Sequence, residues 1–154
     1  MRNIRLRNIR LRIAEFGTSD CILRNADCGV ERKRMNSDEL KARTKQFTLR
    51  IIRLVESLPR GRTADVIGRQ LLRSGTSVGA NYRAACRAKS TADFISKMGT
   101  VEEEADESLY WMELLIEAKI VESDKLESLM KEADELLSIT VSSINTARKR
   151  KERK

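Results

Sequence analysis

The stretch Arg73–Ala85, with the sequence RSGTSVGANYRAA, decides how this chain folds. The segments on either side have the composition of helices, yet this stretch combines two glycines, three hydroxyl side chains and an asparagine. A glycine inside a helix costs about 1 kcal/mol relative to alanine. Close packing against a neighbouring helix can recover that cost. We therefore predict a packing notch here, and a ligand-binding pocket is the alternative interpretation.

The notch is expected at Gly75 and Gly79, which lie on or beside the inward face of the helix. Without side chains at these positions, another helix backbone can come close. A bulky residue of the third predicted helix should fill the space. Trp111 and Tyr110 are the candidates.

Asn81 is harder to explain by packing alone. A buried side-chain amide needs hydrogen-bond partners. We expect Glu104 or Glu107, on the neighbouring helix, to supply them.

Four amphipathic segments account for most of the chain, which has 154 residues and only one proline. A chain of this length fits one domain. Apolar residues recur at a spacing near 3.5, which is typical of helices in shallow-angle bundles. The inward stripes are Leu40, Phe47, Ile51, Leu54 and Leu58; Leu71, Gly75, Val78, Tyr82 and Ala85; Phe94, Met98, Val101, Ala105, Leu109, Met112 and Ile116; and Leu126, Leu129, Ala133, Leu137, Thr140 and Ile144. Short connections between them predict an all-α, antiparallel up-down-up-down four-helix bundle over residues 35–148.

Hydroxyl side chains mark the predicted helix starts. Ser37, Thr63 and Ser123 each precede an apolar stripe and are expected to be N-caps. Ser90 and Asp93 have the spacing of a capping box at the start of the third helix.

Both ends of the chain are basic and differ from the bundle. Residues 1–34 carry nine basic and four acidic residues and include a tandem NIRLR repeat. We interpret this poorly structured extension as read-through upstream of a start at Met35, and an arginine-rich nucleic-acid arm is the alternative. Residues 149–154 are expected to form an exposed basic tail after the last helix.

Cysteine and histidine usage narrows the chemistry. Cys21, Cys28 and Cys86 have neither the number nor the spacing of a disulfide framework or a zinc site. Cys86 is expected to be a small buried hydrophobe, and a reducing cytoplasm is the expected location. The chain contains no histidine, which removes the usual general base and metal ligand. No run of 18 apolar residues predicts a membrane span.

Charge is divided sharply along the bundle. Residues 41–89 carry twelve basic and two acidic residues, whereas residues 93–135 carry four basic and fourteen acidic residues. The first predicted hairpin is therefore strongly positive and the second strongly negative.

Arginines of the second predicted helix form a stripe. Arg69, Arg73, Arg83 and Arg87 fall within about 80° of one another on a helix with 3.6 residues per turn. Arg62 extends this stripe, and a looser one on the first helix contains Arg43, Arg50 and Arg53. Guanidinium groups bind phosphate oxygens in pairs, so the stripe predicts a nucleic-acid-binding surface of a backbone-directed kind.

Two other interpretations use the same residues. Charged helix faces are usually just solvated. Alternatively, the basic hairpin contacts the acidic hairpin of a neighbouring subunit, which would give a purely protein-binding oligomeric scaffold. The sequence leaves these possibilities open.

The acidic residues of the third predicted helix raise an enzymatic alternative. Glu104 and Glu107 have an i, i+3 spacing that facing carboxylates in a metal-binding bundle also show. Because no histidine accompanies them, we interpret the cluster as a solvated or subunit-facing surface. No metal, cofactor or catalytic residue is expected.

The quoted stretch, followed by ADFISKMGTVEEEADESLYWMELL, resembles a family of small bacterial four-helix-bundle proteins. The family is named for reading frames within intervening sequences of 23S rRNA genes. It includes the accessory variability protein of diversity-generating retroelements. The resemblance covers residues 38–144 and implies the same fold.

The function implied by the resemblance is limited. Retroelement members look like homopentamers with basic surfaces that associate with nucleic acid and a reverse transcriptase, so these are the implied partners. No catalytic residue is recognised in the family, and none is carried over. Ala84 and Glu103 depart from the family pattern, in which an acidic residue and a lysine are common at these two positions.

Overall fold

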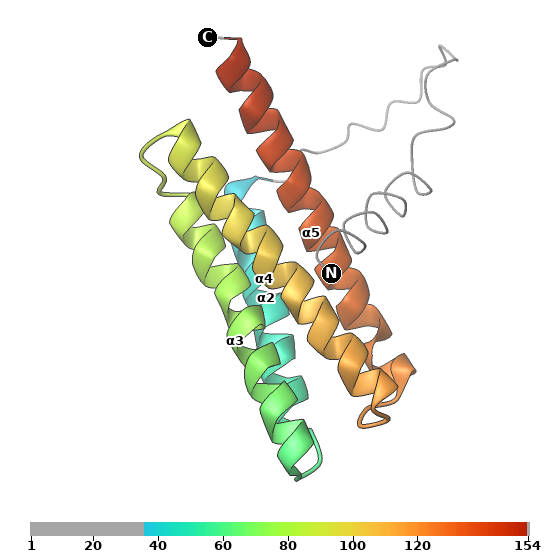
Figure 1. The fold of residues 1–154 in the computed structure, drawn as a ribbon. Helices are drawn as coiled ribbons and strands as arrows, with labels where there is room; N and C mark the ends of the chain where they lie inside the picture. The colour runs from blue at the N-terminus through green and yellow to red at the C-terminus, as the bar shows by residue number, and fades with distance from the viewer. Residues whose placement is uncertain (1–35, 154) are drawn as a thin grey trace, which may run out of the picture. The chain divides into compact units, whose positions relative to one another are not determined.

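The computed structural model describes residues 36–153, which form four helices (Figure 1). They are α2 (Ser37–Glu56), α3 (Arg62–Ala85), α4 (Thr91–Glu117) and α5 (Ser123–Glu152). Successive helices run in opposite directions and lie side by side, and the described residues contain no strand. The predicted all-α four-helix bundle is confirmed, and the predicted extension over residues 1–34 lies outside the described residues.

The helices do not contact one another equally. α3 packs extensively against α4 and α2, and α4 packs extensively against α5. The interface between α2 and α5 is the sparsest of the four. α3 is therefore the helix through which α2 is attached to the rest of the bundle. Within residues 36–153, no helix combines the length and the apolarity needed to span a bilayer.

The predicted stripes form the core. Every predicted inward position of α3 and α5 is buried, and the largest fully buried side chains include Phe47, Ile51, Leu71, Met98 and Met112. Full burial of each such side chain stabilises the fold by about 1.5–3 kcal/mol. Several predicted positions are only half-buried: Leu54, Leu58, Phe94, Leu109 and Ile116.

The helix starts differ from the prediction in three cases. α2 is capped by Asn36, whose side-chain oxygen accepts hydrogen bonds from the Asp38 and Glu39 N–H groups at 2.9 and 2.8 Å. Asn36 therefore takes the place expected for Ser37. The prediction that Thr63 and Ser123 are N-caps is also wrong, because each residue lies inside its helix and neither helix start has a side-chain cap.

Ser90 does cap α4. Its hydroxyl oxygen accepts a hydrogen bond from the Asp93 N–H at 3.1 Å. The second bond of the predicted capping box is displaced by one residue, since the Asp93 carboxylate accepts from the Lys89 N–H at 3.0 Å.

The C-terminal ends of α3 and α5 also correct two expectations. α3 ends at Ala85, so Cys86 falls in the following turn, where it is exposed rather than buried. α5 continues to Glu152, so most of the segment expected to be a tail after residue 148 is helical.

The notch is present, but α2 fills it. A Cβ atom on Gly75 would lie 2.8 Å from Ile51, and one on Gly79 would lie 3.2 Å from the Thr48 hydroxyl. Thr48 also donates a hydrogen bond to the Gly75 carbonyl oxygen at 3.0 Å. The prediction that Trp111 or Tyr110 of α4 fills it is wrong, because the glycines face α2.

The expected partners of Asn81 are also wrong. Its side-chain nitrogen donates to the Ser77 carbonyl oxygen of the same helix at 3.0 Å. Asn81 is only half-buried, so it needs no carboxylate from α4.

Replacement of Gly75 by alanine should destabilise the bundle by about 1–3 kcal/mol, because the new methyl group overlaps the buried Ile51 side chain. Gly99→Ala is the matched control in α4. No atom lies within 4 Å of a Cβ atom built there, so this change should stabilise the bundle by roughly 1 kcal/mol. Urea unfolding of both variants measures the difference. A stabilised Gly75→Ala variant would contradict the tight α2–α3 contact.

Candidate functional site

The predicted arginines divide into two groups. Arg43, Arg50 and Arg73 contact other helices of the same chain. The remaining five are exposed and form no hydrogen bond or ion pair within residues 36–153: Arg53, Arg62, Arg69, Arg83 and Arg87. Arg87 lies in the turn after α3 rather than in the helix. The stripe on α3 is therefore present, but it is interrupted at Arg73.

Arg73 joins α3 to α4. Its guanidinium donates to Glu107 at 2.5 Å and lies 3.6 Å from Glu104. Trp111 donates its indole N–H to the same Glu107 oxygen at 3.0 Å. The Arg73 side chain remains 53% exposed, so the pair is a surface interaction that orients the two helices.

The two carboxylates beside Arg73 have opposite pKa shifts. Burial raises the pKa of Glu104, and the attraction of Arg73 only partly offsets this; one Glu104 oxygen is buried without a hydrogen-bond partner. Burial also acts to raise the pKa of Glu107, but hydrogen bonds from Trp111 and Arg73 outweigh it and hold this pKa below its usual value.

Two buried hydroxyl groups, one on α3 and one on α4, also connect these helices. The hydroxyl oxygens of Ser74 and Ser108 are 3.0 Å apart and hydrogen-bonded. Small polar side chains on both helices allow a close approach at this level. The sequence signal for this contact was the serine in the glycine-rich stretch, but its partner could not be read from spacing.

Arg43 and Arg50 connect α2 to α5. Arg43 donates to Glu132 at 2.7 and 2.9 Å and also pairs with Glu135. These carboxylates hold the pKa of Arg43 well above its usual range, although burial acts in the opposite direction. Arg50 donates to the Ser128 hydroxyl at 2.7 Å. Arginines predicted to bind phosphate therefore link the two helices that share the least packing.

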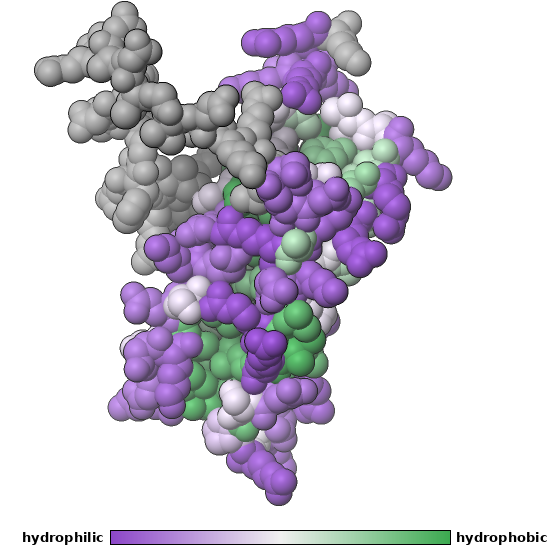
Figure 2. Space-filling model, turned by 180° about the vertical axis from the view of Figure 1, so that it is seen from behind, coloured by the Kyte–Doolittle hydropathy of each residue, from purple (hydrophilic) through white to green (hydrophobic). Residues whose placement is uncertain are grey.

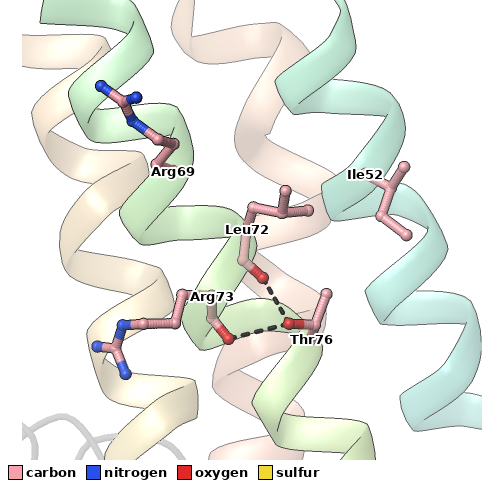
Figure 3. A pocket seen from close by; sticks show the side chains of 5 residues that line it. All are labelled: Ile52, Arg69, Leu72, Arg73 and Thr76. Atoms are coloured by element: carbon pink, nitrogen blue, oxygen red, sulfur yellow. Dashed lines mark hydrogen bonds between the residues drawn. The ribbon is translucent and has the colours of Figure 1, made fainter.

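An open groove lies between α2 and α3. It has a volume of about 590 Å³ and is lined by Ile52 of α2 and by Arg69, Leu72, Arg73 and Thr76 of α3. Figure 3 shows that both guanidinium groups are directed toward the α4 side of α3, away from Ile52. The floor of the groove is therefore apolar, and its cationic groups stand on one side. Ile52 and Leu72 lie outside the predicted stripes, so the sequence pattern did not indicate them.

The face of the bundle drawn in Figure 2 is mainly hydrophilic. Figure 2 views the bundle from the side on which α2 lies, and its largest hydrophobic area is toward the α2–α3 turn. Val66, at the start of α3, is 48% exposed. The aromatic side chains in residues 36–153 are all buried or half-buried, which leaves little ring surface for stacking nucleic-acid bases in this part of the chain.

The acidic residues of α4 and α5 do not converge. Among the described residues, no three carboxylate or thiol side chains are grouped so that they could hold a metal ion. Glu104 and Glu107 point to Arg73 rather than to a second carboxylate pair.

Known proteins with this pattern identify the family. The sequence pattern of the 23S rRNA-intervening sequence proteins matches residues 38–142. The chain belongs to this family. The match covers nearly all of the four helices and ends before the last turns of α5. The family predicted from the glycine-rich stretch and the acidic helix is confirmed.

A solved structure of the same architecture is also similar. It is a protein with unknown function from the S23 ribosomal protein family of Bacteroides thetaiotaomicron. The two sequences are 38% identical, and the alignment covers 68% of this chain and 97% of that one with a TM-score of 0.65. No curated protein matches the chain.

Within the family pattern, the two departures lie in different surroundings. Ala84 is half-buried near the end of α3, and Glu103 is exposed on α4. Neither residue forms one of the hydrogen bonds through which Arg43 and Arg73 connect the helices.

The opposite pKa shifts of Glu104 and Glu107 predict opposite effects of neutral substitutions at pH 7. Glu107→Gln should lower the free energy of unfolding by about 0.5–1 kcal/mol, because it removes the ion pair with Arg73. Glu104→Gln, its matched control, should raise the free energy of unfolding, because the buried charge is removed.

Both differences should disappear on acidification. The folded-state pKa of Glu107 is lowered, so its contribution is present above about pH 4.5 and is lost as pH falls through the folded value. The penalty at Glu104 is also absent once that carboxyl group is protonated in both states. Urea unfolding from pH 7 to pH 3 tests this. If both substitutions change the free energy of unfolding in the same direction at pH 7, the opposite effects assigned to the two carboxylates are contradicted.

Proposed function

We propose that this protein is a non-catalytic, homo-oligomeric helical bundle that binds the phosphate backbone of RNA or DNA in the cytoplasm. Its binding surface includes the exposed arginines Arg69, Arg83 and Arg87 of the α3 side. Its role is that of an accessory in a larger nucleic-acid assembly. The observation that supports this most strongly is the set of exposed arginines that have no partner within the described residues.

The chemistry favours backbone contacts over base reading. Guanidinium groups pair with phosphate oxygens in a fixed fork geometry. The whole chain has a formal net charge of +8, which attracts polyanions over a long range. Since the aromatic side chains of the bundle are buried or half-buried, base stacking should contribute little. Affinity should therefore depend strongly on salt and weakly on sequence.

The proposal leaves out Arg43 and Arg73. Both are held by carboxylates of the acidic hairpin, so a phosphate would have to replace an existing ion pair. Arg50 is similarly engaged with Ser128. The proposed binding surface therefore contains fewer arginines than the eight that the sequence suggests.

The family supplies the biological setting of the proposal. Its name ties its members to intervening sequences of 23S rRNA. The resemblance to retroelement accessory proteins adds a homopentamer and a reverse transcriptase as proposed partners. A binding role rather than catalysis also fits a sequence that contains no histidine.

A second candidate function is a protein-binding scaffold. The groove with the half-buried side chains of Ile52 and Leu72 on its floor favours it, because apolar surface beside charges is typical of subunit contacts. In this alternative, the basic hairpin of one subunit contacts the acidic hairpin of the next.

Substitution of Arg69, Arg83 and Arg87 by glutamine should weaken binding to short RNA and DNA duplexes and lower the salt slope by about 3. The matched control replaces Lys119, Lys125 and Lys131, which are exposed on the acidic side, and removes the same total charge. Fluorescence anisotropy between about 50 and 200 mM salt measures both. Equal losses of affinity in the two variants would show that binding depends on the net charge of the protein and not on these three arginines.

Thr76→Arg should separate the two candidate functions. The long side chain would occupy the groove between α2 and α3, so a scaffold that assembles there should dissociate. Ala80→Arg places the same side chain one turn further along α3, on an exposed position outside the groove. Native mass of both variants is the measurement. Unchanged assembly of Thr76→Arg would remove the groove as a subunit interface.

A further inference from the structure

Basic residues are concentrated at one end of the bundle. Because successive helices alternate in direction, α3 and α5 finish at the end where α2 and α4 begin (Figure 1). Residues 36–42, 83–97 and 145–153 at this end carry ten basic and four acidic residues. At the opposite end, residues 53–69 and 113–127 carry six basic and seven acidic residues. The positive charge is thus segregated along the bundle axis as well as between the hairpins.

The cations at this end are mostly available. Lys41 pairs with Asp38 and Lys97 pairs with Asp93, which accounts for two of them. Arg148 of α5 interacts electrostatically with Glu102. The other seven are exposed, and their side chains have no hydrogen bond or ion pair within the described residues: Arg83, Arg87, Lys89, Lys149, Arg150, Lys151 and Arg153.

Like charges are also held near each other here. The pairing with Asp38 raises the pKa of Lys41 on α2, and the positive charge of Arg83 on α3 acts in the opposite direction as the smallest of the effects. The C-terminal dipoles of α3 and α5 favour a cation in the last turn of each helix. That effect falls off within one turn, whereas the basic residues extend over two turns of α5 and into the turn after α3.

We propose that the nucleic-acid backbone is bound at this end of the bundle, by the cations in the last turn of α3 and the turn after it and by those that complete α5. We call this surface the basic end and define it by Arg83, Arg87, Lys89, Lys149, Arg150 and Arg153. The inference rests on the proposed function and makes it specific: the contact is axial, with two phosphate-binding arms from two helices, rather than a line along α3.

The opposite end provides a matched control on the same hairpin. Arg53, Arg60 and Arg62 are exposed and without a partner in the described residues, as are the arginines of the basic end. The same end of the bundle, however, also contains the α4–α5 turn (Figure 1), and four carboxylates lie in or beside that turn in the sequence: Glu117, Glu122, Asp124 and Glu127. Those carboxylates repel phosphate, so exposure alone should not make these arginines a binding surface.

The test compares three glutamine variants of the full chain. The first replaces Arg83, Arg87 and Lys89, the second replaces Lys149, Arg150 and Arg153, and the third replaces Arg53, Arg60 and Arg62. Each removes three positive charges. Binding to labelled RNA and DNA duplexes of mixed sequence is followed by anisotropy between about 50 and 200 mM salt, and circular dichroism with native mass verifies folding and assembly.

The first two variants should each lose roughly tenfold or more in affinity and about 3 in salt slope, while the third stays close to the original protein. Equal losses in all three, a larger loss in the third, or unchanged binding by the second would overturn the basic end while leaving nucleic-acid binding intact. If the original protein itself shows no salt-dependent binding to either duplex, the proposed function fails and this inference fails with it.

Discussion

The close approach of α2 to α3 at Gly75 is the contact on which the rest of the structure depends. Ile51 packs where a side chain would otherwise stand, and Thr48 donates to the carbonyl oxygen of the glycine. Because α3 also provides the main contact with α4, its rotation about its own axis is fixed from both sides. That rotation places Leu71 and Val78 in the core and turns Arg69 and Arg83 toward solvent.

Ion pairs between the helices add to the contacts that apolar packing provides. The basic and acidic hairpins meet at the two seams of the bundle, through Arg73 with Glu107 and through Arg43 with Glu132. The second pair matters most for the architecture, because α2 and α5 share little apolar packing. Some of the arginines that the sequence suggested for ligand binding therefore hold the helices of the bundle together. The remainder is a surplus that forms no ion pair with a carboxylate of residues 36–153.

The sequence predicted which positions are buried better than it predicted their neighbours. Apolar spacing located the four helices, and the two glycines located the notch, because both depend on periodicity within one helix. Spacing cannot say which helix faces a given side, so α4 was expected where α2 packs. The same limit applies to Arg73, whose angular position was right but whose carboxylate partners depend on the register of α3 against α4. Ile52 and Leu72 were missed because a groove requires two helices to be placed together.

Arg69 and Arg73 show how finely position decides the role of a residue. They are one turn apart on the same side of α3, and both line the same groove. Arg73 is level with Glu104 and Glu107 and contributes to the contact between helices, whereas Arg69 has no partner in the described structure. A polyanion gains little from a cation that must first release a carboxylate, because the cost of leaving that carboxylate unpaired offsets the new contact. Axial position relative to the acidic residues of α4 and α5, rather than net charge, is therefore the property that should determine where this bundle binds phosphate.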